Sequence, residues 1–204
     1  MQTAEKPEVE LARALLAGDK SAFEPFVEVF GGKVFQYTYL MCGQREDAEE
    51  VAQDTLLKIF ESFDQLKDPE SVKPWVFRIA KNYCLMKRRK SVFAPQRELS
   101  LDELLPLRNG EGDRPLEIAD LSALPDDEVM RLELNSHLEK ALTELPDMYR
   151  SVVLLRDVEG MSTAEAAAVL DVSEDVVKQR LHRGRLALRK SLDAYVRSGV
   201  AGRG

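Results

Sequence analysis

Residues 162–190 read STAEAAAVLDVSEDVVKQRLHRGRLALRK, and this stretch decides the fold of the C-terminal part of the chain. Ser162 and Glu165 have the spacing of a capping box, which predicts the first turn of a short, alanine-rich helix. Asp171 and Val172 predict a tight turn, and Ser173 is a favourable N-cap for the longer helix that follows. A short helix, a turn of a few residues and a longer basic helix together predict a helix-turn-helix, a motif that binds the major groove of DNA.

The longer helix has two different faces when successive residues are placed about 100° apart. The small and apolar face, which we expect to pack on the preceding helix, consists of Val177, Leu181, Gly184 and Leu188. Gly184 costs about 1 kcal/mol relative to alanine in a helix interior, which predicts a close approach of two helices at this position. The opposite face holds side chains that neutralise phosphates or read base edges, namely Lys178, Gln179, His182, Arg183, Arg185 and Arg189. A basic stripe alone would equally fit a solvated helix face, but the capped helix and turn before it favour DNA binding.

Charge is distributed unevenly along this chain of net charge −7. Residues 91–130 contain ten acidic residues and three arginines, and the rest of the chain contains 26 of each sign. Two runs contain no acid: residues 73–90 hold seven Lys or Arg, and residues 178–190 hold six. Because clustered cations are what nucleic acid requires, the distribution favours nucleic-acid binding although the total does not.

The acidic segment has the composition of a linker. It shows no sustained periodicity and contains Pro95, Pro106, Gly110, Gly112, Pro115 and Pro125. Helices are expected after it over residues 127–145 and 146–158, the second closed by Gly160. Neither flank alternates as a strand does, so we predict an all-α fold with two small helical domains joined by a flexible acidic linker, the second domain containing the helix-turn-helix. The expected boundaries are 1–92, 93–127 and 128–204.

The first domain is predicted to open with two short helices. Ser21 and Glu24 have capping-box spacing ahead of a helix that the glycine pair at 31–32 is expected to end. A further helix is expected over residues 34–41.

A longer helix is predicted over residues 47–63, with Asp47 and Glu50 as its capping box. The face expected to be buried consists of Ala48, Val51, Ala52, Leu56, Ile59, Phe60 and Phe63. The other face is acidic with one leucine pointing outward, and it consists of Glu50, Gln53, Asp54, Leu57 and Glu61.

The last helix of the first domain is predicted over residues 72–90, with Pro74 tolerated in its first turn. Its expected buried arc consists of Trp75, Val76, Ile79, Tyr83 and Met86. A basic arc surrounds Leu85 and consists of Arg78, Lys81, Arg88 and Arg89, with Asn82 at its border. Aromatic rings beside cations suit single-stranded DNA, although Trp75 is better explained as a core residue.

The composition argues against several other classes of protein. Two cysteines, Cys42 and Cys84, are too few and too scattered for a disulfide framework or a zinc cluster, which favours a reducing cytoplasm. We expect no secretion signal, membrane insertion, cofactor or metal. The chain has no Gly-rich phosphate loop or nucleophile motif, and two isolated histidines, His137 and His182, do not form an active site, so we do not expect an enzyme.

Four stretches in this order resemble the extracytoplasmic-function sigma factors of bacterial RNA polymerase, and the resemblance covers nearly the whole chain. They are LLAGDKSAFEPFVEVFGGKVF (15–35), DAEEVAQDTLLKIFESF (47–63), PWVFRIAKNYCLMKRRK (74–90) and LTELPDMYRSVVLLRDVEGMSTAEAAAVLDVSEDVVKQRLHRGRLALRK (142–190). The resemblance implies an alternative sigma factor that binds core RNA polymerase and directs initiation at promoters with particular −35 and −10 elements.

The resemblance also implies roles for individual residues. The polymerase-docking residues would be Glu50, Gln53, Asp54 and Leu57. Recognition of the −10 element would fall to Arg78, Lys81, Asn82, Lys87 and Arg88, with the loop at 64–72. Recognition of the −35 element would fall to Lys178, Gln179, His182, Arg183 and Arg185. The implied partners are core RNA polymerase, promoter DNA and a cognate anti-sigma factor that covers both DNA-binding faces.

Two features depart from the family's pattern. Alanines stand at 166–168, where family members often carry larger or acidic residues, and YCLMKRRK after Asn82 lacks the usual aspartate or asparagine. The acidic linker could mimic nucleic acid inside the polymerase or serve as a solvated tether. The main alternative is a helix-turn-helix regulator that is not a polymerase subunit; it would bind a palindrome as a dimer and would not need residues 47–90.

Overall fold

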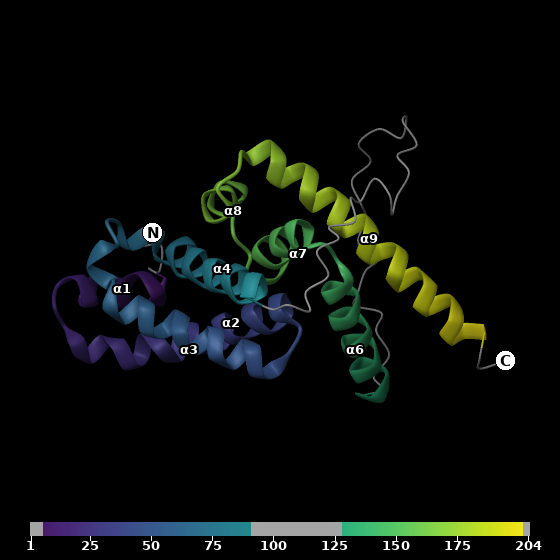
Figure 1. The fold of residues 1–204 in the computed structure, drawn as a ribbon, viewed down its shortest axis with the longest axis horizontal. Coiled ribbons are helices and arrows are strands. Elements are labelled where there is room, and N and C mark those ends of the chain that lie inside the picture. Colours follow the sequence, from purple (N-terminus) through teal and green to yellow (C-terminus); the bar gives the residue numbers. More distant parts are fainter. Residues whose placement is uncertain (1–5, 91–127, 202–204) are drawn as a thin grey trace, which may run out of the picture.

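The computed structural model describes residues 6–90 and 128–201, and within these two ranges every regular element is a helix (Figure 1). The first range contains α1 (Pro7–Leu16), α2 (Phe23–Cys42), α3 (Arg45–Glu61) and α4 (Val72–Lys90). The second contains α6 (Glu128–Glu144), α7 (Asp147–Val153), α8 (Thr163–Leu170) and α9 (Glu174–Ala201). The all-α prediction is confirmed, and the predicted linker lies outside the described residues.

α2 is one continuous helix, so the predicted break at the glycine pair 31–32 is wrong. Its buried side chains continue through the pair at intervals of three and four residues, and they are Phe26, Phe30, Val34, Tyr37, Thr38, Leu40 and Met41. This packing outweighs the low helix propensity of two glycines. The helix ends at Gly43, whose φ of 78° is left-handed and whose N–H donates to the carbonyl of Tyr39.

The predicted caps in the first domain are also wrong. Ser21 lies within a short 3-10 turn, η1 (Lys20–Ala22), and Asp19 is the capping residue, since its carboxylate accepts from the N–H of Ser21 at 3.0 Å. α3 starts at Arg45 without a side-chain cap, two residues before Asp47. The acidic side chains at the start of α3 still lie in its first turn, where they favour the positive end of the helix dipole.

α4 is buried on a different arc from the predicted one. Its fully buried side chains are Val72, Val76, Phe77, Ala80 and Cys84. Met86 is 46% exposed instead of buried, and Trp75 is partly buried against Phe63, at 5.5 Å between ring centroids. The arc is shifted because α4 packs against α2 and α3 on one side and against α8 on another.

The second domain follows the predicted order of helices. α7 continues into one turn of π-helix, η5 (Leu154–Val158), and Gly160 follows it with a φ of 64°. The capping box of α8 is confirmed, because the Ser162 hydroxyl accepts from the N–H of Glu165 and the Glu165 carboxylate accepts from the N–H of Ser162. Asp171 takes the left-handed conformation in the turn, with a φ of 57°. The helix-turn-helix prediction is therefore correct in its geometry.

Candidate nucleic-acid and polymerase interfaces

α9 is held against α7 by its small and apolar face. Val177, Leu181 and Leu188 are buried, as their spacing predicted. A Cβ added to Gly184 would lie 2.8 Å from Cγ2 of Val153 and 3.5 Å from the carbonyl oxygen of Tyr149. The predicted close approach is thus present, but the helix that comes close is α7 rather than α8.

The opposite face of α9 presents part of the predicted −35 set to solvent. Lys178, Gln179 and His182 are exposed, and Lys178 pairs with Asp175 one turn earlier at 3.2 Å. Such a pair between exposed side chains is weak, so Lys178 can exchange it for a phosphate at little cost. Arg183 is half-buried.

Arg185 is engaged within the protein. Its Nε and Nη2 donate to the two carboxylate oxygens of Asp157, at 3.0 and 2.5 Å. This bidentate pair raises the pKa of Arg185 above its ordinary value. It also fixes α9 to the π-turn of η5, so Arg185 positions α9 in this structure. Asp157 lies 28 residues earlier in the chain, which is why the sequence did not reveal the pair.

On α4, two predicted −10 residues donate to the end of α8. Nη2 of Arg78 donates to the carbonyl of Ala168 at 2.7 Å, and Nζ of Lys81 donates to the carbonyl of Val169 at 3.0 Å. The last carbonyls of a helix have no partner within the helix and carry its negative dipole, so two cations stabilise this end of α8. Burial lowers the pKa of Lys81, and the neighbouring Arg78 lowers it further.

The rest of the predicted −10 set is divided between exposed and paired side chains. Asn82 is exposed. Nη1 of Arg88 is ion-paired with Asp147 at the start of α7. Nζ of Lys87 pairs with Glu50 at 2.5 Å and with Asp47 at 3.1 Å. The structure thus places all five residues along α4. Arg78 and Asn82 are exposed, whereas Lys81, Lys87 and Arg88 are partly buried.

The predicted polymerase-docking residues lie together along the outer face of α3. Glu50, Gln53 and Asp54 are exposed, and Leu57 is 57% exposed, which confirms its predicted outward position. Phe60, which was expected in the core, is 54% exposed and touches the ring of Phe23 with 4.8 Å between centroids. Leu57 and Phe60 are three residues apart, and their exposure gives this otherwise acidic face an apolar part.

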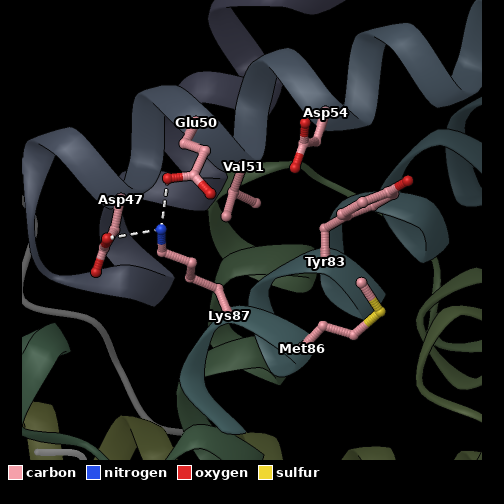
Figure 2. Close-up of a pocket in the computed structure, with 7 residues that line it drawn as sticks. All are labelled: Asp47, Glu50, Val51, Asp54, Tyr83, Met86 and Lys87. Atoms are coloured by element: carbon pink, nitrogen blue, oxygen red, sulfur yellow. Dashed lines mark hydrogen bonds and ion pairs between the residues drawn. The ribbon is translucent and has the colours of Figure 1, made fainter. Parts of the chain in front are cut away.

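A groove of about 330 Å³ lies between the predicted docking face of α3 and α4 (Figure 2). Its lining residues are Asp47, Glu50, Val51, Asp54, Tyr83, Met86 and Lys87. Lys87 reaches across from α4 to the two carboxylates of α3, as Figure 2 shows. The hydrogen bonds to Glu50 and Asp47 raise the pKa of Lys87. The groove therefore joins predicted docking residues to a predicted −10 residue.

Arg150 of α7 is a structural residue that the sequence analysis missed. It is 5% exposed, and its guanidinium donates to the carbonyls of Met41 at 2.9 Å, Leu145 at 2.7 Å and Thr143. These carbonyls lie at the ends of α2 and α6, where backbone acceptors lack helical partners. Burial lowers the pKa of Arg150, and Asp147, 3.8 Å away, opposes this effect. One side chain thus satisfies carbonyls from both predicted domains.

Further contacts also join the two predicted domains. Nζ of Lys73 donates to the carbonyl of Glu159 and lies 4.0 Å from its carboxylate, whose pKa burial raises. Figure 1 shows α8 beside α4, with α9 running from α8 past α7 and α6. Buried apolar side chains of both ranges form one continuous cluster. The second domain therefore contacts three residues of the basic arc of α4, namely Arg78, Lys81 and Arg88.

Residues 6–90 and 128–201 contain no group of three or more His, Cys, Asp or Glu side chains arranged to hold a metal ion. No helix among them has the length and apolar character needed to cross a membrane.

Comparison with known proteins identifies both halves of the chain. The Sigma-70 region 2 profile matches residues 26–92, and the Sigma-70, region 4 profile matches residues 137–188. The ECF RNA polymerase sigma factor SigW of Bacillus subtilis is 32% identical over 177 residues, which cover 86% of this chain and 91% of SigW. The ECF RNA polymerase sigma factor SigM of Mycobacterium tuberculosis is 28% identical and covers 96% of this chain and 89% of its own.

Solved structures share the fold. CnrH in complex with the cytosolic domain of CnrY has a TM-score of 0.64 at 26% identity, over 93% of this chain and 99% of CnrH. The sigma factor RpoE of Bartonella quintana, in complex with the anti-sigma factor NepR, has a TM-score of 0.58 at 21% identity, over 84% of this chain and 96% of RpoE.

Proposed function

Since this chain belongs to the ECF sigma factors of RNA polymerase, we propose that it binds core polymerase through the outer face of α3 and reads promoter DNA with α4 and α9. It acts as an initiation factor, and the polymerase supplies the chemistry. We place its action in the cytoplasm, with core polymerase and promoter DNA as its partners.

The observation that carries the proposal is the helix-turn-helix geometry of α8 and α9. A capped α8, a left-handed turn at Asp171 and a tightly packed Gly184 fix α9 in place. Lys178, Gln179 and His182 then project from the N-terminal half of α9, the part that a recognition helix presents to base edges. Gln179 suits adenine, whereas Lys178 suits guanine or phosphate. We assign these three residues to −35 recognition, together with Arg183 and, when it leaves Asp157, Arg185.

Polymerase docking is supported by the character of the α3 face. Glu50, Gln53 and Asp54 surround Leu57, and an exposed leucine within a polar rim suits a protein interface better than water. In interfaces of this kind, a few buried side chains contribute most of the binding energy.

Promoter melting by α4 requires a change in the arrangement described here. Arg78 and Lys81 donate to the carbonyls of α8, and Arg88 pairs with Asp147. These cations cannot hold a DNA backbone at the same time, so −10 recognition by Arg78, Lys81 and Arg88 includes separation of α4 from α7 and α8. Lys87 has to leave Glu50 and Asp47 of α3 instead, and Asn82 contacts an unpaired base. We also propose that an anti-sigma factor binds this chain, because a structural neighbour is described in complex with one.

The alternative of a regulator that acts without polymerase has less support. Region 2 and region 4 profiles both match, in the order of a sigma factor, and SigW aligns over most of both chains. A dimeric repressor would need only the second domain.

A comparison of matched variants tests the assignments. Leu57→Asp is expected to lower the affinity for core polymerase at least tenfold, while Leu16→Asp, a change at an exposed leucine of α1, leaves it unchanged. Gln179→Ala is expected to lose discrimination at one −35 base, while Lys190→Ala at an exposed position further along α9 keeps it. Equal effects of each variant and its control would contradict the assignments.

A further inference from the structure

The structure brings together two cysteines that the sequence separates by 42 residues. Cys42 is the last residue of α2, and Cys84 lies within α4. Their sulfur atoms are 4.0 Å apart, and these are the only cysteines in the chain. Both are free thiols here. Because a disulfide bond is about 2.05 Å long, closing it requires an approach of only about 2 Å.

The two thiols differ in their surroundings. Cys42 is half-buried, so a small oxidant can reach it, whereas Cys84 is fully buried within the helical core. A hydrogen bond with Cys84 lowers the pKa of Cys42, and Arg88 and Lys87 act in the same direction against burial and Asp47. The hydrogen bond and burial both raise the pKa of Cys84. The thiolate is the reactive form of cysteine, so Cys42 is the thiol that attacks first.

We propose that Cys42 and Cys84 form a redox-active pair that hydroperoxides convert into an intramolecular disulfide. The Cys42 thiolate attacks the O–O bond of hydrogen peroxide, which yields a sulfenic acid at Cys42 and releases hydroxide, which takes up a proton as water. Sγ of Cys84 then attacks the sulfenic sulfur; the S–S bond forms, the S–O bond breaks, and the departing hydroxide takes the Cys84 proton. In total, two thiols lose two electrons, and one peroxide becomes two waters.

The position of the pair connects its oxidation to the contact between the domains. Cys42 directly follows Met41, whose carbonyl accepts from Arg150, and Cys84 lies one helical turn before Arg88, which pairs with Asp147. A hydrogen bond of 2.9 Å does not survive a displacement of an ångström or more. The pair therefore lies beside a carbonyl and a guanidinium that α7 contacts, at one end of the basic arc of α4.

Intact-mass analysis of the full chain tests the proposal directly. The reduced protein is treated with an equimolar amount of hydrogen peroxide, unfolded, and then exposed to a thiol-alkylating reagent. We expect a monomer about 2 Da lighter that takes up no alkyl group and that regains two alkylation sites after treatment with dithiothreitol. Digestion without reduction is expected to give one cross-linked pair of peptides, containing residues 42 and 84.

Single variants test the order of the two steps. In Cys84→Ala the sulfenic acid at Cys42 has no second thiol to react with, so Cys42 is expected to keep one or more added oxygen atoms. In Cys42→Ala the buried Cys84 is expected to stay unmodified at the same peroxide concentration. Circular dichroism of both variants checks that they are folded. If the wild-type chain instead gains oxygen at Cys42, forms disulfides only between chains, or keeps two alkylatable thiols, the proposal is wrong. The wild-type result decides this even if neither variant folds.

Discussion

Replacing Gly184 by alanine tests the packing that positions α9. The new methyl group would lie 2.8 Å from Cγ2 of Val153, closer than real side-chain contacts. Val153 is buried and has a stiff side-chain torsion, and the carbonyl of Tyr149 at 3.5 Å belongs to the backbone, so neither neighbour yields easily. Overpacking of this kind costs about 1–3 kcal/mol, against a gain of about 1 kcal/mol in helix propensity. We therefore expect Gly184→Ala to destabilise the protein by about 1 kcal/mol.

Gly32→Ala supplies the matched control. Gly32 is also inside a long helix, but it is exposed and a Cβ there would meet nothing within 4 Å. Only the propensity gain remains, so this variant is expected to be more stable by about 1 kcal/mol. The two Gly→Ala changes should thus shift the free energy of unfolding in opposite directions.

Urea unfolding followed by circular dichroism measures both variants. A second change, Val153→Ala, removes the clashing methyl group, so its cost should be smaller by about 1 kcal/mol in the Gly184→Ala background than in the wild type. If Gly184→Ala stabilised the protein as much as Gly32→Ala does, α9 would not lie against α7 as described. The same conclusion would follow if Val153→Ala cost equally in both backgrounds.

Three other changes test separate parts of the structure. Ser162→Ala removes the capping box with Glu165 and should cost about 0.5–2 kcal/mol, measured by urea unfolding; no loss would show that the cap is unimportant. Lys178→Ala should weaken promoter binding by the holoenzyme and reduce the slope of log affinity against log salt by about 1, whereas an unchanged slope would exclude a phosphate contact. Arg150→Lys keeps the charge but loses the planar guanidinium that reaches several carbonyls. We expect the free energy of unfolding, measured by thermal or urea unfolding, to fall by about 2–3 kcal/mol. A smaller effect than that of Gly184→Ala would contradict the role of Arg150.

The helix-turn-helix could be predicted from the sequence because its determinants are local. The capping box, the turn at Asp171 and the cap at Ser173 each involve residues at most three or four positions apart. Gly184 predicts a close approach because glycine costs about 1 kcal/mol in a helix interior, but the pattern does not identify α7 as the neighbouring helix. These local patterns fix which face of α9 is exposed.

Other features depend on contacts that no local pattern contains. The break predicted at residues 31–32 was wrong, since packing along α2 outweighs the propensity of glycine. The buried arc of α4 was misplaced because α8, some 90 positions later, covers part of it. Arg150 reaches across 109 positions to Met41, and Cys42 lies 42 positions from Cys84, so only the folded chain shows these pairs.

Run-off transcription with purified core RNA polymerase tests the central claim most directly. Genomic DNA fragments are transcribed by core polymerase with and without this protein, and the new start sites are mapped. We expect initiation at a limited set of sites that share sequences near −35 and −10, with Leu57→Asp abolishing it and Leu16→Asp leaving it intact. If the protein directed no new initiation on any fragment, or if Leu57→Asp were fully active, the account of this chain as a sigma factor docked through α3 would be contradicted.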